Sequence, residues 1–513
     1  MRRDLCYDGF AVLAFCRWGS LDNDRLKDGR KSNGVCWGES VDFILYVFPS
    51  IFIISFCIVI IIDNKNPVHT MAWLIVIIAL PVAGVILYLM LGRNYKKNRL
   101  YQKLLEEGVF RRASEVAFVR NTPEAQRTGN FEQFITRNSF HPPFYNNQTR
   151  LYYEGRHWLA QLIHDIDQAK HHIHMEFYIM RNDSAGQLVR DALLRRADSG
   201  VTVRILLDRV GSWQLAYLHR SFLKPLFLHP NVEFSWFYPT RIPFIQIRIN
   251  YRNHRKMVII DGSVGYTGGM NVADEYVEGG KFAYWRDAQL RIEGDAVHSL
   301  QVVFLVDWYT AKKEYLFNDR FFPLCQEGEG RGKGVQIVPG GPDQRWESIA
   351  QAYFCMITDA REEVLISSPY LIPDEPLLMA LKTAALRGVE VKLLVPERPD
   401  HHIVYWASCS YYRELLRAGV RIFAYQEGFV HAKIVVCDHL LASVGSANFD
   451  LRSLYTNFEL NALLYDPEDI RQLRLRVNED ISHSREITLD DVNRWPWSKR
   501  FRHSVARIFS PLV

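Results

Sequence analysis

Two short stretches of the chain carry the same reactive side chains in the same order. Each holds a histidine, a lysine two residues later and an aspartate five residues after the lysine: His254, Lys256 and Asp261 in the first stretch, and His431, Lys433 and Asp438 in the second, 177 residues further on. An imidazole can act as a nucleophile or general acid near neutral pH, and an ammonium group stabilises an anionic centre. Two such pairs suit attack on a phosphate diester, with one histidine attacking phosphorus and the other protonating the leaving oxygen.

Polar side chains that can hold a phosphate follow both stretches. They are Asn271 after the first copy, and Ser446 and Asn448 after the second. We expect these groups and the two lysines to bind the non-bridging oxygens, which is work that a metal ion performs in other enzymes. Catalysis is therefore predicted to need no metal and no other cofactor. The eight cysteines form no CxxC pair, so they indicate neither a zinc site nor a disulfide framework.

Each stretch is predicted to form a β-strand. Residues two apart in a strand point to the same side, so each histidine would stand beside its lysine. The apolar runs 257–260 and 434–437 would then be buried. A single histidine on an apolar strand is most often a core residue, but packing alone does not explain why five residue types recur in the same order. We therefore favour a catalytic function.

The segments around the two stretches repeat one alternation of helix and strand. Apolar periodicity predicts helix, strand, helix and strand at 158–169, 172–180, 187–197 and 201–207, and again at 346–360, 364–368, 377–386 and 389–395. Such alternation indicates α/β layers. We predict two duplicated α/β sandwich domains, 146–335 and 336–513, related by a pseudo-twofold axis. His254 and His431 would then meet in one cleft, because the reaction needs both.

The N-terminal part of the chain differs in composition from the rest. Segments 43–62 and 71–91 contain no charged residue, and 20 helical residues at about 1.5 Å each span a hydrocarbon core of about 30 Å. We predict a transmembrane hairpin of two helices within 41–95, with a pair of buried core helices as the alternative. Lysine and arginine lie mainly outside the hairpin, which predicts cytoplasmic ends. Residues 1–40 are expected to be a poorly ordered leader, and 96–145 a connector.

The two stretches that contain His254 and His431 resemble the paired HxKxxxxD motifs of the phospholipase D superfamily. Similarity to its cardiolipin synthase branch is carried by five stretches: Asn-Tyr-Arg-Asn-His-Arg-Lys at 250–256, Thr-Gly-Gly-Met-Asn at 267–271, Ser-Pro-Tyr at 368–370, Gly-Phe-Val-His-Ala-Lys at 428–433 and Phe-Ser-Pro-Leu at 509–512. The similarity runs from about Phe43 to the C-terminus. One departure is Gly269 in the first copy where the second has Ser446, so the first copy lacks a hydroxyl donor.

The resemblance implies two phospholipase D-like domains and a specific reaction. A phosphatidyl group would pass from one phosphatidylglycerol to a second, giving cardiolipin and glycerol through a phosphohistidine. His254 is expected to be the nucleophile and His431 the acid and base. The resemblance also implies that acids hold the histidines in the correct tautomer, and the candidates are Glu459 and Asp287. Asp261 and Asp438 complete the motifs and are counted as catalytic, although a strand-ending acid can equally brace a turn.

Several other activities use the same residues. A hydrolytic phospholipase D or another phosphatidyltransferase would share the histidines, whereas membrane spans argue against a nuclease and two intact motifs against an inactive scaffold. The net charge of +5 is too small to indicate nucleic acid. The expected partners are phosphatidylglycerol and membrane lipid, with no nucleic acid and no metal, and the expected location is the cell membrane with cytoplasmic catalytic domains. Residues 495–509 suit either an interfacial helix or an ordinary packed terminal helix.

Overall fold

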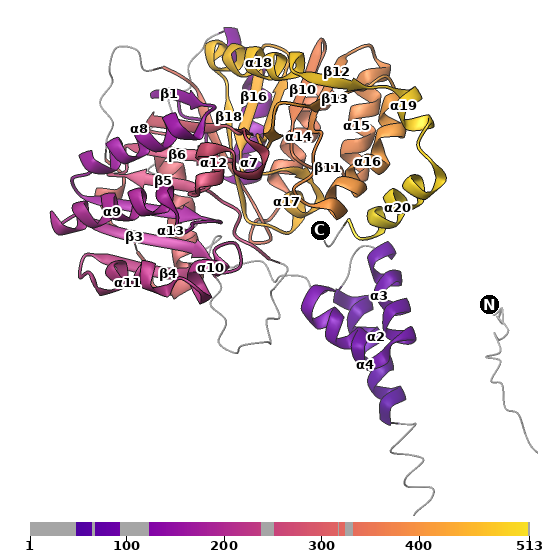
Figure 1. Ribbon diagram of the computed structural model, residues 1–513, viewed down its shortest axis with the longest axis horizontal. Coiled ribbons are helices and arrows are strands. Elements are labelled where there is room, and N and C mark those ends of the chain that lie inside the picture. Colours follow the sequence, from indigo (N-terminus) through magenta and orange to yellow (C-terminus); the bar gives the residue numbers. More distant parts are fainter. Residues whose placement is uncertain are drawn as a thin grey trace, which may run out of the picture. The chain divides into compact units, whose positions relative to one another are not determined.

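Two mixed sheets with matching strand order lie between the helices of the two halves (Figure 1). The computed structural model describes residues 48–63, 67–92, 123–237, 251–316, 318–323 and 332–510. The first sheet has the order β1-β8-β6-β5-β2-β3-β4, and the second has the order β19-β13-β12-β10-β15-β16-β18-β9. Read from opposite ends, the two orders match strand for strand, and β19 is an addition at one edge. The structure thus contains the predicted duplication.

The strands of each half have similar lengths. The first sheet consists of β1 (Asn147–Tyr152), β2 (His172–Phe177), β3 (Thr202–Asp208), β4 (Val232–Phe237), β5 (Met257–Ile260), β6 (Val264–Gly268) and β8 (Gln289–Gly294). The second consists of β9 (Val335–Gly340), β10 (Glu363–Ser367), β12 (Glu390–Pro396), β13 (Arg421–Tyr425), β15 (Ile434–Cys437), β16 (Leu441–Gly445), β18 (Glu459–Leu464) and β19 (Ser484–Ile487). In the first sheet β2, β3 and β4 run parallel, and β5, which follows His254, pairs antiparallel with β2. In the second sheet β10, β12 and β13 run parallel, and β15, which follows His431, pairs antiparallel with β10.

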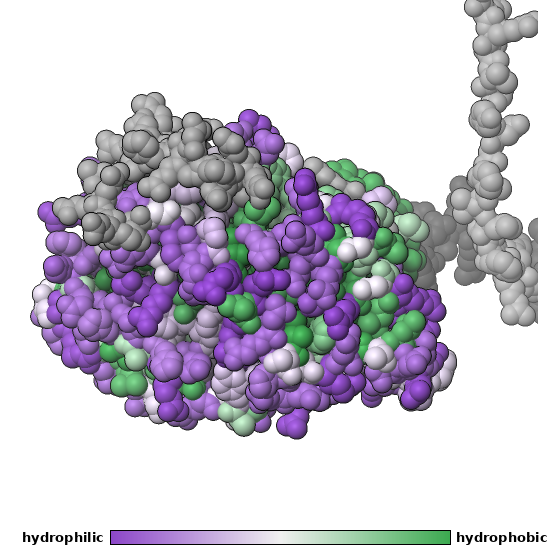
Figure 2. Space-filling view, turned by 90° about the horizontal axis from the view of Figure 1, so that it is seen from above, coloured by the Kyte–Doolittle hydropathy of each residue, from purple (hydrophilic) through white to green (hydrophobic). Residues whose placement is uncertain are grey.

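Helices connect the strands and cover the sheets. The first half contains α8 (Gly155–Gln168), α9 (Ser184–Asp198), α10 (Trp213–Tyr217), α11 (Arg220–Leu228), α12 (Asp274–Glu278) and α13 (Val297–Lys312). The second contains α14 (Ser348–Asp359), α15 (Glu375–Leu386), α16 (His402–Arg417), α17 (Leu451–Tyr455), α18 (Pro467–Ser482), α19 (Leu489–Asn493) and α20 (Trp497–Ile508). Short 3-10 turns lie at Gly280–Phe282 and Asp319–Phe321. Hydrophilic side chains dominate the face of the molecule seen in Figure 2, most clearly on the side of the first half.

The two sheets share a core. Alternate residues of β5 point to opposite faces, so Met257 and Ile259 enter a cluster that also contains Ile434 and Val436 of β15, while Val258 packs on the other face. Strand β15 follows the same rule. The inner faces of both halves therefore pack together with α13 and α18, which also contribute to this cluster, and the predicted face-to-face arrangement of the halves is present.

One detail of the predicted strands is wrong. The ladders of β5 and β15 begin at Met257 and Ile434, directly after the lysines, so neither histidine belongs to the strand itself. The extended segments before the strands cross to the opposite half instead, as described below. The part of the chain from Val82 to Val513 is one compact unit that contains both halves. The boundaries at 145/146 and 335/336 therefore stay predictions.

The predicted connector is partly helical. Helix α7 (Pro123–Ser139) places Phe131 and Ile135 in the outer core of the second half, beside Ile349 and Tyr353 of α14. Gln336 of β9 donates to the His141 carbonyl at 2.7 Å. This end of the connector is thus packed on the second sheet although it precedes the first in sequence. Residues 93–122, like the predicted leader, lie outside the described part of the chain.

The N-terminal apolar segment forms shorter helices than predicted. They are α2 (Phe48–Asp63), α3 (Pro67–Ala79), α4 (Pro81–Leu87) and the π-helical turn η2 (Tyr88–Gly92). Within the described residues, none of the helices combines the length and hydropathy needed to cross a membrane, so the predicted transmembrane hairpin is not found there. The second predicted span is interrupted at Leu80, because Pro81 has no N–H and its ring disfavours a helical residue before it. Residues 43–47 of the first span are not among those described.

Candidate active site

Two short crossings between the halves position His254 and His431. Strand β14 (Phe429–Val430) pairs in parallel with β7 (Trp285–Arg286), and Asn253 forms a parallel bridge with Phe458. The residue after each crossing is a histidine on one side and an acid on the other. The backbone N–H of His431 donates to the Arg286 carbonyl at 2.6 Å, and that of His254 donates to the Phe458 carbonyl at 2.9 Å. Each histidine is therefore held next to the acid of the opposite half.

His254 of the first half is paired with Glu459 of the second. Its Nδ1 lies 3.0 Å from both carboxylate oxygens, and Glu459 is fully buried. Burial raises the pKa of Glu459, but His254, Lys256 and the Ser446 hydroxyl outweigh it, so the pKa is lowered and the carboxylate stays charged. A charged acceptor at Nδ1 fixes the proton there. The Nε2 lone pair of His254 is then available for attack.

His431 of the second half is paired with Asp287 of the first. The Nδ1–Oδ2 distance is 2.6 Å, and both side chains are at least nine-tenths buried. Burial lowers the pKa of His431 to about 4, with Lys433 adding to the effect and Asp287 opposing it. Burial also lowers the pKa of His254 to about 4. Both rings are thus neutral near pH 7 before an anion enters the site.

Gly269 and Ser446 occupy equivalent places beside the two acids. The Gly269 N–H donates to the Ala288 carbonyl at 2.8 Å and the Ser446 N–H to the Leu460 carbonyl at 2.9 Å, each the residue after the acid. Ser446 donates its hydroxyl to Glu459 and accepts from the Leu460 N–H, so the hydroxyl positions the acid rather than phosphate. A Cβ at Gly269 would lie 2.0 Å from Oδ1 of Asp287. Gly269 lacks the hydroxyl group of Ser446, and the space without a side chain is occupied by Asp287.

Each lysine contacts the backbone of the histidine two residues before it. Lys256 donates from Nζ to the His254 carbonyl at 2.6 Å, and Lys433 donates to the His431 carbonyl. Burial lowers the pKa of Lys256 to about 7 and that of Lys433 to about 8, although nearby acids act in the opposite direction. The lysines thus sit close to the titration point at neutral pH. An anion between them would restore their full charge.

The histidines line one cavity of about 610 Å³, together with Asn271 and Asn448. Asn271 is already engaged, because its Oδ1 accepts from the Ile179 N–H at 3.0 Å and its Nδ2 donates to the Tyr276 hydroxyl at 2.6 Å. The buried Oδ1 of Asn448 has no hydrogen-bond partner in the described part of the chain. An amide oxygen only accepts hydrogen bonds, so a phosphate oxygen would need the Nδ2 group of Asn448, and this side chain also forms a hydrogen bond with Asp450.

Asp261 and Asp438 lie away from the histidines. Each follows a four-residue strand, which is about 13 Å long. Asp261 accepts from the N–H groups of residues 170, 171 and 172 at 2.7 to 2.9 Å. Asp438 accepts from those of 361, 362 and 363. Both have φ of 53°, so these carboxylates brace the turns at the far ends of the strands, and the structure does not bring them to the cavity.

Two aromatic rings of the cavity were not singled out from the sequence. Tyr178 lies edge-on to His254 with ring centroids 4.9 Å apart, and Tyr276 lies edge-on to His431 at 5.7 Å. They limit the orientations that the imidazoles can adopt. Tyrosine is common in this chain, and nothing in the local pattern distinguishes these two from core residues. No cluster of three or more metal-binding side chains occurs among the described residues, and metal-free catalysis stays a prediction.

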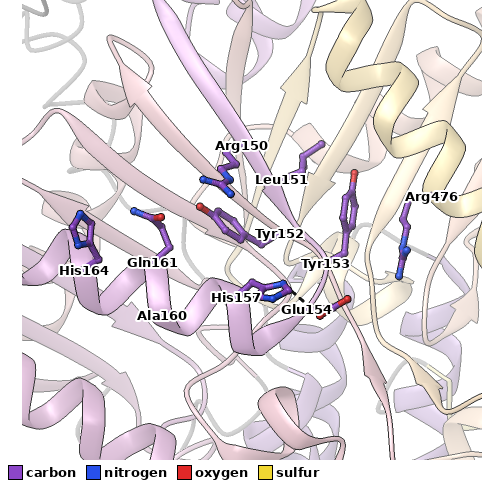
Figure 3. A pocket seen from close by; sticks show the side chains of 10 residues that line it. All are labelled: Arg150, Leu151, Tyr152, Tyr153, Glu154, His157, Ala160, Gln161, His164 and Arg476. Atoms are coloured by element: carbon purple, nitrogen blue, oxygen red, sulfur yellow. Dashed lines mark ion pairs between the residues drawn. The ribbon is translucent and has the colours of Figure 1, made fainter.

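A second cavity of about 520 Å³ lies at the edge of the first sheet (Figure 3). It is lined by residues of β1, of α8 and of the turn between them and by Arg476 of α18, and neither His254 nor His431 contributes to it. His157 and Glu154 form an exposed ion pair at its rim, with 3.4 Å between Nδ1 and Oε2. It shares no lining residue with the cavity that holds the histidines.

Comparisons with known proteins agree with this geometry. A family model described as "Cardiolipin synthase, PLD-like domain" matches residues 162–299 and 353–481, and one described as "Phospholipase D-nuclease N-terminal" matches 51–93. The chain is 42% identical to a cardiolipin synthase of Geobacillus kaustophilus over 93% of this chain and 95% of that protein. It is 41% identical to cardiolipin synthase 2 of Bacillus cereus, with 89% of each chain covered.

A solved structure shows a similar fold. The crystal structure of a phosphatidylserine synthase from Haemophilus influenzae superposes with a TM-score of 0.56 at 15% identity, covering 75% of this chain and all of that one. At this identity the likeness concerns the fold alone. The mixed α/β architecture with two duplicated halves is therefore shared with that protein.

Proposed function

The chain belongs to the cardiolipin synthase family of the phospholipase D superfamily, and on that premise we propose how its two halves transfer a phosphatidyl group between two phosphatidylglycerol molecules. The family predicted from the motifs is confirmed, and the chain is a phosphatidyltransferase. The observation that supports the mechanism best is the exchange of acids. Each histidine is oriented by a carboxylate of the other half, and both line one cavity.

In the first step, Nε2 of His254 attacks phosphorus and the bond from phosphorus to the glycerol oxygen breaks. His431 gives its proton to that oxygen, so glycerol leaves neutral. In the second step, the terminal hydroxyl of another phosphatidylglycerol gives its proton back to His431, its oxygen attacks phosphorus, and the nitrogen–phosphorus bond breaks. A covalent intermediate lets one site serve both lipids in turn.

The buried charges explain how His431 becomes an acid. With the cavity empty, burial and Lys433 keep its pKa near 4. A phosphodiester between the histidines adds a negative charge that favours the imidazolium and the charged lysines together. Binding of the substrate therefore favours protonation of His431 and of the two lysines when the reaction needs these charges. The Asn448 amide and the lysines would hold the non-bridging oxygens.

Transfer to a lipid and hydrolysis differ only in the acceptor. The test is to incubate the purified protein in detergent with phosphatidylglycerol as the only lipid and to identify the products. Cardiolipin and free glycerol in equal amounts are expected. Phosphatidic acid as the main product would identify a hydrolase, and the His254→Ala variant serves as the control for contaminating activity.

The N-terminal helices support attachment to a membrane. Their surfaces are strongly apolar, and Ile62, Ile78 and Val82 are between 68% and 76% exposed. We propose that this segment lies in the lipid phase of the cell membrane and that both of its ends face the cytoplasm, because lysine and arginine are concentrated outside it. A reporter cysteine beside Arg93 should resist an impermeant thiol reagent added to intact cells. Labelling from outside would reverse this orientation.

A further inference from the structure

The last helix of the chain is fixed to the second half by one side only. In α20, His503 and Ala506 are buried, and α20 packs on α16. The guanidinium of Arg502 lies 4.5 Å from the Trp406 ring centroid, and that of Arg507 lies 4.4 Å from the Tyr411 ring centroid. Figure 1 shows α20 beside α16 at the edge of the second half. The orientation of the helix about its axis is thus determined by packing.

The opposite side of α20 is apolar and exposed. Trp497, Phe501 and Ile508 are 76%, 56% and 73% exposed. At about 100° per residue their positions fall within about 40° of one another, and the buried His503 and Ala506 lie on the far side. Trp497 and Phe501 stack with ring centroids 5.3 Å apart. Exposed Arg500 and Arg507 border this stripe on one flank.

We propose that the Trp497–Phe501–Ile508 stripe of α20 docks on the surface of the bilayer that supplies the lipid substrate. Tryptophan with aliphatic and aromatic neighbours and bordering arginines suits the boundary between headgroups and acyl chains. The arginines complement a surface rich in anionic phosphatidylglycerol. A stable protein interface buries about 800 Å² on each partner, which is far more than three side chains on one helix offer.

Helix α20, which carries the stripe, is attached close to the cavity that His254 and His431 line. His401 is the N-cap residue of α16 and lines the catalytic cavity. Trp406, five residues later, carries the contact with Arg502 of α20. Five helical residues correspond to about 8 Å, so α20 is anchored one to two turns from the cavity rim. Docking of this stripe would hold the half that contributes His401 and His431 to the cavity at the surface of the bilayer.

The direct test is photo-crosslinking in the full-length protein. The photoreactive residue benzoylphenylalanine replaces Phe501 in one variant and Leu386 in another, and each protein is reconstituted into phosphatidylglycerol vesicles with an acyl-labelled phosphatidylglycerol. Leu386 is the matched control, because it is 75% exposed on α15 of the same half. Labelled lipid is expected on the position-501 variant and not on the position-386 variant. Crosslinking of position 501 to the N-terminal helices or to a second copy, equal lipid labelling of both variants, or no adduct would overturn the proposal.

A functional test separates docking from catalysis. The Trp497→Ser/Phe501→Ser double variant should turn over phosphatidylglycerol about tenfold more slowly in vesicles, because two large apolar side chains are lost from the interface. In detergent micelles with excess lipid its turnover should equal that of the parent protein. Leu386→Ser should change neither rate. Equal loss in micelles and vesicles would contradict a docking role, whereas absence of cardiolipin formation by the parent protein itself would reject only the proposed reaction.

Discussion

The two copies of the catalytic motif have the same backbone course but are supported differently. Between histidine and lysine the first copy has Arg255, and the second has Ala432. Arg255 is buried and donates to Asp307 at 2.5 Å, to the Glu459 carbonyl at 3.0 Å and to the Gly340 carbonyl at 3.0 Å. It thereby ties the first motif to the strand of the acid that orients its histidine. Ala432 only fills space in the shared core.

In the second copy the buried arginine lies next to the acid, on β7, and not between the histidine and the lysine. Arg286 stands before the acid Asp287 and binds Asp480 with Nε 2.9 Å from each carboxylate oxygen. It also donates to the Tyr153 carbonyl at 2.9 Å. One crossing is therefore stabilised from the histidine side and the other from the acid side. Both crossings thus hold a histidine against an acid, while the buried ion pairs beside them differ.

Removal of each histidine is the strongest test of whether the halves differ in role. His254→Ala should abolish turnover and leave no covalent lipid adduct. His431→Ala should slow turnover by roughly 10² to 10⁴-fold, the usual contribution of general acid catalysis, and still give an adduct with an activated donor. Rapid acid-free quench and mass spectrometry locate the phosphatidyl group. An adduct on His431 and none on His254 would exchange the two roles.

Arg255→Ala is expected to destabilise the protein by about 3 to 5 kcal/mol, because Asp307 would remain buried without its partner. The matched control is Arg421→Ala, whose ion pairs with Glu390 and Glu486 are exposed and worth less than about 1 kcal/mol. Unfolding midpoints measured in the same detergent compare the two. Equal shifts would show that the network behind the first motif is not needed for stability.

Exchanging the residues beside the acids should damage the halves unequally. Gly269→Ser places a Cβ within 2.0 Å of Asp287 Oδ1 and should displace the acid from His431, lowering kcat by roughly 100-fold. Ser446→Gly removes one hydrogen bond to the Glu459 carboxylate and should cost about tenfold. Steady-state rates with phosphatidylglycerol measure both. A larger loss for Ser446→Gly would contradict the packing argument.

The lysines predict a fall in kcat/KM on the alkaline side. Because burial lowers the pKa of Lys256 to about 7 and that of Lys433 to about 8, both are charged below these values and lose their protons as pH rises through them. The free enzyme then binds an anionic lipid less well, whereas bound phosphate keeps the lysines charged and moves the fall in kcat to higher pH. A kcat/KM profile that stays flat from pH 6 to 9 would count against these shifts.

The smallest expected effect is that of a chelator. Because the proposed mechanism assigns one lysine of each half to the phosphate, EDTA should change the rate of cardiolipin formation by less than about twofold, within the precision of such assays. The comparison with the His254→Ala background excludes a metal-dependent contaminant. Loss of activity that one particular divalent ion restores would show that a metal takes part.

Much of the chemistry was determined by the sequence alone. The repeated order of His254 and His431 with their lysines indicates phosphodiester chemistry, and the resemblance to the family implies the reaction. The repeated helix and strand pattern indicates the duplicated fold. The resemblance to the family predicts Glu459 and Asp287 as the acids, and the structure places both within hydrogen-bonding distance of a histidine. Local spacing and residue type carry this information, because strand and helix periodicities depend on neighbours in the chain.

Only the tertiary structure decided which acid serves which histidine. His254 and Glu459 are 205 residues apart, and His431 and Asp287 are 144 apart, so the pairing depends on how two sheets pack and not on any local pattern. The same packing places Asp261 at a turn, and it leaves no room for a side chain at Gly269 beside Asp287. Periodicity assigns a residue to a face of its own element, but contacts between elements follow from the shape of the whole core.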